Sequence, residues 1–251
     1  MMKTMPWFAL AATCLLLPSL HAADAPPYED KFETATTDSG SATSTLTWKS
    51  RNAKPIFSIA PDEDGIKSGK ALVAKSGMFY ASFKDITLEK GTSLKLTFQF
   101  RFTKAPIDAG NTFRVGLFND TNGNPEDGKS PGYWLMTNPG SVTSKGMIFF
   151  EQGIDGAMGG GTDCLLVGTF FPAFDAQATV HKLTLSVSMP DDGSNVEIKY
   201  KLDDETPVSM IDSESRVKTF NTLGINTITG ADADCAFVID NVTLSVDKSA
   251  K

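Results

Sequence analysis

The strongest constraint in this sequence is a strict alternation of apolar and polar residues over Ser93–Phe102. Successive side chains of a β-strand point to opposite faces, so every second residue shares a face. One face of this segment carries only Leu and Phe, at positions 94, 96, 98, 100 and 102, and the other carries Lys, Thr, Gln and Arg. A strand with this pattern buries one face and leaves the other polar, which is typical of an antiparallel sheet.

The same pattern recurs along the chain between turn-forming residues. Thr112–Phe118, His181–Met189 and Val196–Leu202 alternate in the same way, and the turn Pro190-Asp191-Asp192-Gly193 predicts a hairpin between the last two. Shorter strands are predicted at Thr45–Ser50, Ile56–Ala60, Ala71–Lys75, Met78–Phe83, Tyr133–Thr137, Met147–Phe150, Leu165–Phe171, Thr222–Ile228 and Ala236–Ser245. No stretch shows a helical stripe of useful length, so the sequence predicts an all-β fold, a two-sheet antiparallel sandwich.

The first 22 residues have the features of a secretory signal peptide. Lys3 supplies a positive start, Trp7–Leu20 is a short apolar run, and small Ala22 precedes an acceptable cleavage site. The run is shorter than the roughly 20 apolar residues that span a bilayer, so a transmembrane anchor is not favoured. We expect residues 1–22 to be removed and residues 23–251 to form a single β-sandwich domain that is secreted, periplasmic or held at the cell surface.

Charge and composition narrow the function further. The formal net charge of -7 argues against a nucleic-acid partner, because binding to phosphates needs a basic surface. The chain has two His, one of them His21 in the predicted signal peptide, which leaves little room for a His-based catalytic or metal site. Cys164 and Cys235 remain after cleavage, and they form either one disulfide, as exported proteins allow, or two buried thiols.

Four segments resemble the concanavalin A-like or laminin G-like jelly rolls of exported bacterial proteins: FRVGLFND, GYWLM, VHKLTLSVSMPDDGSNVEIKYKLDD and FVIDNVTLSV. The resemblance extends from about Tyr28 to Val246 and rests on strand order, with no diagnostic catalytic signature. It implies a jelly roll in which one concave sheet commonly binds or cleaves polysaccharide. It also implies a structural calcium ion where the first and last strands meet.

Asp30 and Asp240 are the expected calcium ligands. In Ala236–Ser245, the apolar residues stand at odd positions up to Ile239 and at even positions from Val242 onwards. This shift by one residue predicts a β-bulge that changes the direction of the Asp240 side chain. If the terminal strands are neighbours, as the resemblance implies, Asp30 lies beside Asp240. Two carboxylates at a core edge repel each other unless a cation lies between them, and calcium prefers oxygen ligands. The alternative is that both residues cap turns and bind water.

The polar faces of the clearest strands are the expected carbohydrate site. The predicted residues are Gln99, Arg101, Arg114, Trp134 and Glu151. Sugars offer C–H faces that pack on aromatic rings and hydroxyls that hydrogen-bond to planar polar groups. Alternation requires that one of Tyr133 and Trp134 face the core. The alternative is that the arginines only pair with exposed acids.

No catalytic set is recognisable in the sequence. By the resemblance, a glycosidase of this fold carries an alternating Glu-x-Asp-x-x-Glu strand, but the nearest match, Glu151–Asp155, has the wrong spacing. His181 shares the parity of Leu183 and is expected in the core. The chain is therefore predicted to be a secreted, non-catalytic carbohydrate-binding module. A diverged polysaccharide hydrolase or lyase, with Glu151 as its carboxylate, and a structural or protein-binding surface component are the alternatives.

Overall fold

The structure is a computed structural model that describes residues 27–38, 41–43, 46–51, 56–62, 66, 69–103, 112–120, 130–137, 146–151, 158, 162–168, 179–228 and 235–248. The predicted signal peptide, residues 1–22, lies outside the described residues. The described residues form strands and turns without a helix, so none of them belongs to a membrane-spanning helix.

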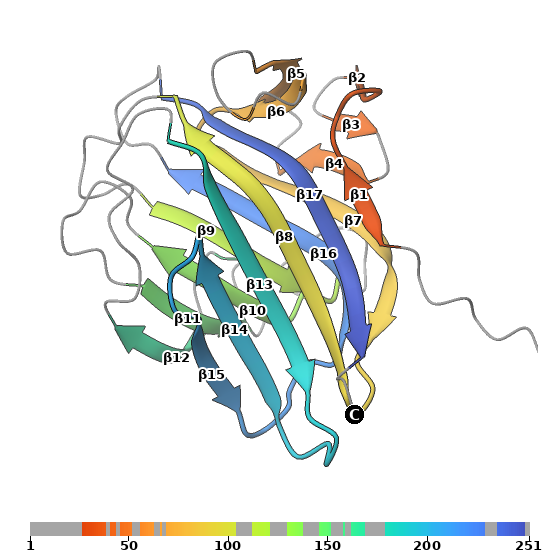
Figure 1. Cartoon of the computed structure of the whole chain (residues 1–251), viewed down its shortest axis with the longest axis vertical. Helices are drawn as coiled ribbons and strands as arrows, with labels where there is room; N and C mark the ends of the chain where they lie inside the picture. The colour runs from red at the N-terminus through yellow and green to blue at the C-terminus, as the bar shows by residue number, and fades with distance from the viewer. Residues whose placement is uncertain are drawn as a thin grey trace, which may run out of the picture.

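Two antiparallel sheets pack face to face (Figure 1). Sheet A consists of β1 (Tyr28–Asp30), β5 (Phe57–Pro61), β6 (Lys70–Ala74), β8 (Thr92–Phe102), β13 (His181–Met189), β14 (Val196–Leu202), β15 (Val208–Asp212) and β17 (Phe237–Lys248). Its order is β15-β14-β13-β8-β17-β6-β5, and β1 also pairs with β17. Sheet B consists of β2 (Thr36–Asp38), β3 (Ser41–Thr43), β4 (Thr47–Ser50), β7 (Gly77–Thr87), β9 (Thr112–Phe118), β10 (Gly132–Thr137), β11 (Gly146–Glu151), β12 (Thr162–Gly168) and β16 (Thr219–Ile228). Its order is β12-β11-β10-β9-β16-β7-β4-β3-β2.

The alternation in the sequence predicted the long strands well. β9, β13 and β14 have the predicted bounds, and β8 begins one residue earlier, at Thr92. The predicted hairpin is confirmed, since β13 pairs with β14 from Leu183 opposite Leu202 to Ser188 opposite Glu197. The short strands β2 and β3 and the edge strand β15 were not predicted.

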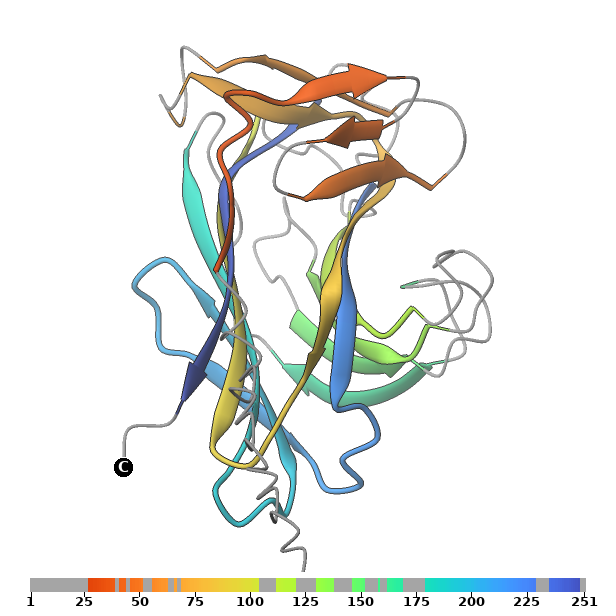
Figure 2. The ribbon, with the colours of Figure 1, turned by 90° about the vertical axis from the view of Figure 1, so that its right-hand side faces the viewer.

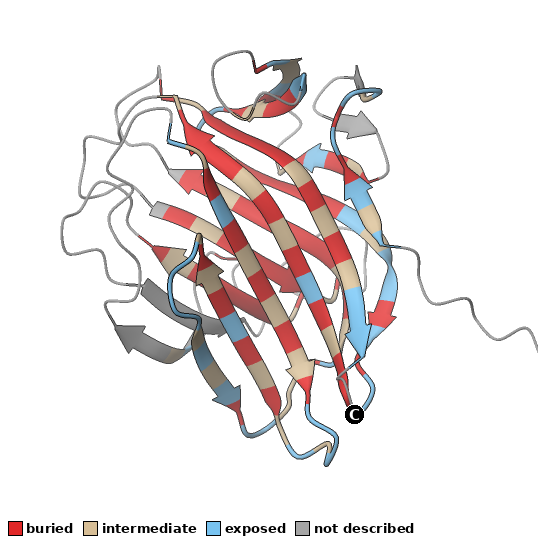
Figure 3. Cartoon of the chain, in the orientation of Figure 1, coloured by how far each residue is buried: buried red, intermediate tan, exposed pale blue. Residues whose placement is uncertain are grey.

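Aromatic rings from both sheets meet in the core between them. Phe100 of β8 stacks on Phe113 of β9 with ring centroids 5.1 Å apart, and Phe237 of β17 lies 5.5 Å from Phe100 and 5.3 Å from Phe113. All three rings are fully buried, and burying one such side chain stabilises the fold by about 1.5–3 kcal/mol. Buried residues accordingly alternate with less buried ones along β8 and β13 (Figure 3).

The first and last described strands meet in sheet A, as predicted. β1 pairs with β17, with Asp30 opposite Val242. The register of β17 against β8 shifts between Asp240 and Thr243, and Asn241 has a positive φ of 52°, so the predicted β-bulge is confirmed. Cys164 is exposed in β12 and Cys235 is buried just before β17, and no disulfide joins these two cysteines.

The two sheets differ in the curvature of their backbones. β9 to β12 bend away from the line of β7 and β16, so the outer face of sheet B is the concave side of a curved sheet (Figure 2). Because β8 pairs only with β13 and β17, and β9 only with β10 and β16, the outer faces of these two strands lie on opposite sides of the sandwich.

Candidate functional site

The middle of the concave face is built by the register of four neighbouring strands of sheet B. In three successive cross-strand rows, the residues that face this side are Met78, Tyr80, Ser82, Arg114, Gly116, Phe118, Gly132, Trp134, Met136, Thr222, Gly224 and Asn226. We refer to these residues as the concave centre. Arg114 is the charged residue among these twelve, and the same rows continue to Lys49, opposite Tyr80, and to Glu151, opposite Gly132.

The central row, which runs Tyr80, Gly224, Gly116, Trp134, contains two glycines, and both are buried. A Cβ at Gly116 would lie 2.5 Å from the Cβ of Trp134 and 2.7 Å from the carbonyl oxygen of Tyr133, so only glycine fits there. A glycine on the face of a strand often marks a close approach by another group. Here the space over the glycines is taken by side chains from neighbouring residues.

Those side chains form an apolar cluster that is separate from the main core. Phe118 and Trp134 of the concave centre pack with Met78 and with Met158, and Met136 lies against them. Met158 comes from the chain between β11 and β12 and is fully buried, although it lies on the outer side of sheet B. A Cβ at Gly224 would lie 2.9 Å from the Cε atom of Met158, which places this side chain directly over Gly224.

Arg114 connects this cluster to Met158. Its guanidinium carbon lies 5.6 Å from the ring centroid of Trp134, a cation–π contact worth about 0.5–2 kcal/mol. One terminal nitrogen, Nη1, donates a hydrogen bond to the backbone carbonyl of Met158. Arg114 therefore points out of the core, as its parity predicted, and it is half-buried by these contacts.

Of the five predicted carbohydrate-binding residues, Arg114 and Trp134 are brought together. Tyr133 is the member of its pair that faces the core, where its hydroxyl donates to Asp212 over 2.7 Å. Glu151 ends β11 opposite Gly132, and its side chain is outside the described structure.

Gln99 and Arg101 do not join this site, which corrects their grouping with Arg114. They lie on β8, whose outer face belongs to sheet A. Arg101 is only 8% exposed and forms an ion pair with Asp62. Burial alone would raise the pKa of Asp62, but hydrogen bonds from Arg101 and from the backbone N–H of Ile66 lower it. Arg101 is thus neutralised within the fold.

Asp240 lies on the same outer face of sheet A, beneath other parts of the chain. It is fully buried; Oδ1 accepts from the backbone N–H of Asn241 over 2.6 Å, and Oδ2 has no hydrogen-bond donor among the described residues. Burial raises its pKa to about 7, and the nearby charges of Glu33, Asp30 and Asp62 add to the shift against the opposing hydrogen bond from Asn241. A buried carboxylate oxygen without a donor is costly when ionised.

Asp30 lies close enough to Asp240 for its charge to raise the pKa of Asp240, and it makes hydrogen bonds of its own within the fold. Its Oδ2 accepts from Nε1 of Trp48 over 2.8 Å and its Oδ1 accepts from the backbone N–H of Phe32 over 3.1 Å, so both oxygens are already engaged within the fold. Among the described residues, no three His, Cys, Asp or Glu side chains converge in a way that could hold a metal ion.

His181 occupies the core position predicted for it. Its ring lies 5.5 Å from that of Phe100, and Nδ1 is hydrogen-bonded to Oδ2 of Asp203 over 2.8 Å. The second oxygen of Asp203 accepts from the backbone N–H of Lys182 over 2.7 Å, and Asp203 has a positive φ of 49°. The pair closes the turn after β14 and orients the His ring against the core.

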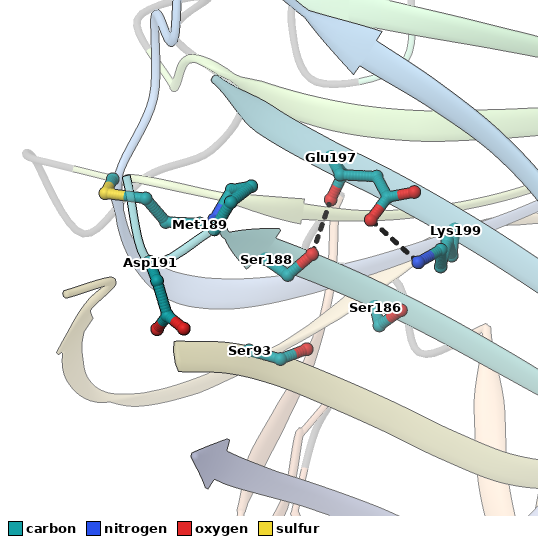
Figure 4. A pocket seen from close by; sticks show the side chains of 8 residues that line it. Ser93, Ser186, Ser188, Met189, Asp191, Glu197 and Lys199 are labelled. Carbon is teal, nitrogen blue, oxygen red and sulfur yellow. Dashed lines mark hydrogen bonds and ion pairs between the residues drawn. The ribbon is translucent and has the colours of Figure 1, made fainter. Parts of the chain in front are cut away.

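The outer face of sheet A has a pocket of its own, of about 440 Å³, at the end of β8, β13 and β14 (Figure 4). It is lined by Ser93, Ser186, Ser188, Met189, Pro190, Asp191, Glu197 and Lys199. Lys199 and Glu197 form an ion pair with 2.7 Å between Nζ and Oε2. The lining has hydroxyls and charges but no aromatic ring, so it lacks a platform on which a sugar could stack.

Sequence reasoning missed the residues that shape the concave centre. Gly116 falls at an outward position of an otherwise regular strand, and that was a usable signal for a close approach. Met158 falls in a Gly-rich stretch without periodicity, and nothing in its neighbourhood predicts that it returns to sheet B.

No family model matches this sequence, and no curated protein matches it. Solved structures are similar in fold. The carbohydrate recognition domain of Emp46p, in a metal-free form, aligns with a TM-score of 0.55 at 12% identity, covering 88% of this chain and 95% of that one. The corresponding domain of Emp47p gives 0.53 at 9% identity, with 89% and 95% covered. An endo-1,3-beta-glucanase from Streptomyces sioyaensis gives 0.52 at 11% identity, with 88% and 95% covered. The chain therefore has the concanavalin A-like jelly-roll fold, and identities this low show the fold alone.

Proposed function

We propose that this chain is an exported, non-catalytic glycan-binding module whose ligand binds at the concave centre. The observation that carries the proposal is the contact between Arg114 and Trp134 on the outer side of the curved sheet B, beside Phe118 and two glycines. Aromatic rings stack on the C–H faces of sugars, and a planar guanidinium donates to sugar oxygens. Two of the similar structures are carbohydrate recognition domains, which supports this class of ligand.

Replacing Arg114 by Ala is expected to weaken glycan binding by about tenfold or more, because a hydrogen bond to a charged group is worth about 1.5–3 kcal/mol. The measurement is titration calorimetry with glycans identified on an array. Lys199→Ala is the matched control, since it removes an exposed cation from the outer face of sheet A. Equal affinities for both variants and the wild type would place the site elsewhere.

Hydrolysis is the alternative supported by the likeness to a 1,3-beta-glucanase. An assay for new reducing ends on the bound glycan separates the two functions. Turnover that disappears in a Glu151→Gln variant would replace the non-catalytic proposal with a diverged hydrolase. Binding without turnover would support the proposal as stated.

We also propose a structural calcium ion at Asp240. The buried Oδ2 atom, which has no hydrogen-bond donor among the described residues, fits a cation, and several other carboxylates lie close enough to raise its pKa. Because Asp30 is already engaged, the remaining ligands would be backbone carbonyls and water, which calcium accepts. Such an ion would neutralise Asp240 at the bulge where β1 meets β17.

Export is tested on the protein recovered outside the cytoplasm of its host. We expect an intact mass that corresponds to a chain beginning at Ala23, because residues 1–22 have the pattern that signal peptidase removes. A recovered chain that still contains these residues would contradict this assignment.

A further inference from the structure

Three lysines surround a pair of threonines on the outer face of sheet A, on the opposite side of the sandwich from the concave centre. Thr184 of β13 lies between Thr97 of β8 and Lys201 of β14 in one cross-strand row. Lys182 precedes Thr184 by two residues and Lys95 precedes Thr97 by two, so both also point outward. We refer to these five residues as the lysine cluster. Figure 1 draws no described segment over this part of β8, β13 and β14.

The geometry of the sheet brings the three ammonium groups within reach of one point above the threonines. The Oγ1 atoms of Thr97 and Thr184 lie 3.3 Å apart. Neighbouring strands are about 4.8 Å apart and residues on one face of a strand about 6–7 Å, so each lysine is attached one such step from a threonine. The flexible four-carbon side chains of the lysines can turn over the threonine pair. A single anionic group placed there meets three positive charges and two hydroxyls.

Two of the three lysines have no acidic partner among the described residues. Neither Lys182 nor Lys201 forms an ion pair within this part of the chain. Lys95 lies 4.0 Å from Asp247, and both side chains are about half exposed, so water weakens this attraction. The positive charges of the lysine cluster are therefore available to a ligand.

The acids nearest to the lysine cluster lie at its borders, and none stands between its lysines. They are Asp203, Asp204, Glu205, Asp240, Asp247 and Glu197. Both oxygens of Asp203 are hydrogen-bonded, one to Nδ1 of His181 and the other to the backbone N–H of Lys182. Asp240 continues the row of Lys182 beyond Gln99 but is fully buried. Glu197 forms an ion pair with Lys199.

The residue types favour a sulfate group over a carboxylate. Arginine presents a planar fork that matches the two oxygens of a carboxylate, whereas the ammonium of lysine is a compact charge with three donors. The lysine cluster has no arginine, and Arg101, on the same face of β8, is paired with Asp62. A sulfate ester has three free oxygens, so it can accept from three ammonium groups while the hydroxyls of Thr97 and Thr184 donate from below.

The pocket on this face has room for the sugar that carries the sulfate. It has a volume of about 440 Å³ and begins at Ser186, the next outward residue of β13 after Thr184 (Figure 4). The hydroxyls of Ser93, Ser186 and Ser188 line it, and such hydroxyls donate to and accept from the hydroxyls of a sugar. Asp191 and Glu197 also line the pocket and disfavour a second anionic group there.

We propose that the lysine cluster binds the sulfate group of a sulfated saccharide whose ring lies over this pocket. The ammonium groups of Lys95, Lys182 and Lys201 hold the sulfate, and the serines of the pocket hold the sugar hydroxyls. The proposal does not depend on the proposed function, because the lysine cluster and the concave centre lie on opposite sheets.

The probe is sucrose octasulfate, compared with neutral sucrose by titration calorimetry at low ionic strength. We expect the sulfated form alone to bind. Combining Lys182→Gln with Lys201→Gln should lower its affinity by about tenfold, because two charge pairs are lost. The matched control combines Lys84→Gln with Lys218→Gln, which removes the same charge from two exposed lysines outside sheet A, on β7 and directly before β16.

Three results would overturn the proposal. Failure of sucrose octasulfate to bind to the wild type would remove the site, and an equal loss in the control would mean that net charge alone attracts the probe. Tighter binding of inositol hexakisphosphate would replace the sulfated ligand by a phosphorylated one. The glycan titration with Arg114→Ala reports on the concave centre alone, so either site can fail without the other.

Discussion

In calcium-free buffer, the melting temperature of the protein is expected to fall as the pH rises from 5 to 8. The pKa of Asp240 is raised from 3.8 to about 7 by burial and by neighbouring carboxylates, so the folded state keeps a proton that the unfolded state has lost. Stability therefore decreases with pH between these two values and levels off above pH 7. Three pKa units correspond to about 4 kcal/mol, an upper limit for the loss.

Asp240→Asn is the control for this titration, because an amide has the same shape and does not ionise. Its melting temperature should vary less between pH 5 and 8, and at pH 8 it should exceed that of the wild type in the presence of chelator. A wild-type profile identical to that of Asp240→Asn would show that Asp240 is already ionised and compensated at pH 5.

Calcium should reverse the loss at pH 8. A ligand that binds only the folded state adds about 2.7 kcal/mol at a hundredfold excess over its Kd. The wild type should therefore recover its melting temperature when calcium is added at pH 8, whereas Asp240→Asn should not respond. If the melting temperature of the wild type depends on pH but does not change when calcium is added, Asp240 is a buried acid at the bulge and the calcium proposal is wrong.

The bulge at Asp240 illustrates what a single sequence can predict about this fold. Alternation reports which face of its own strand a side chain occupies, because that depends on the strand geometry alone. The inward residues of β8, β9 and β13 were assigned correctly for this reason, and so was the change of parity in β17. The edge strand β15 was missed because it is short and its exposed Ile211 disturbs the pattern.

Alternation does not report which sheet a strand joins, and the candidate site depends on that. Arg101 and Arg114 are 13 positions apart and both have outward parity, yet β8 and β9 lie in different sheets. The two arginines therefore point to opposite sides of the molecule, one onto Asp62 and the other onto Trp134. Long-range pairing and the burial of Asp62 decide these environments, and neither leaves a local signal in the sequence.

Asp212 is a second buried acid whose environment is the reverse of that of Asp240. It lies at the end of β15, in sheet A, and accepts a hydrogen bond from the hydroxyl of Tyr133, in sheet B. Its carboxylate also accepts hydrogen bonds from the backbone N–H groups of Glu214 and Arg216, and it forms an ion pair with the guanidinium of Arg216. Burial by itself would raise the pKa of Asp212, but the hydrogen bonds from Tyr133 and Arg216 lower it. This carboxylate thus joins the two sheets at an edge of the sandwich.

Asp212→Ala is accordingly expected to lower the free energy of unfolding by about 3–5 kcal/mol, because it removes the buried carboxylate to which the Tyr133 hydroxyl and the Arg216 guanidinium both donate. Tyr133→Phe removes the hydrogen bond to Asp212 and the one that the hydroxyl accepts from the backbone N–H of Val217, and it should cost about 1–3 kcal/mol. Urea unfolding at pH 7 measures both variants.

The folded-state pKa of Asp212 is depressed, so its stabilisation is complete above the unfolded pKa of 3.8 and is lost as the pH falls below it. The gap between the wild type and Asp212→Asn should therefore narrow in acid, opposite to the behaviour of Asp240. A loss of less than about 1 kcal/mol in Asp212→Ala would mean that water replaces the carboxylate at this edge and that the core alone holds the two sheets together.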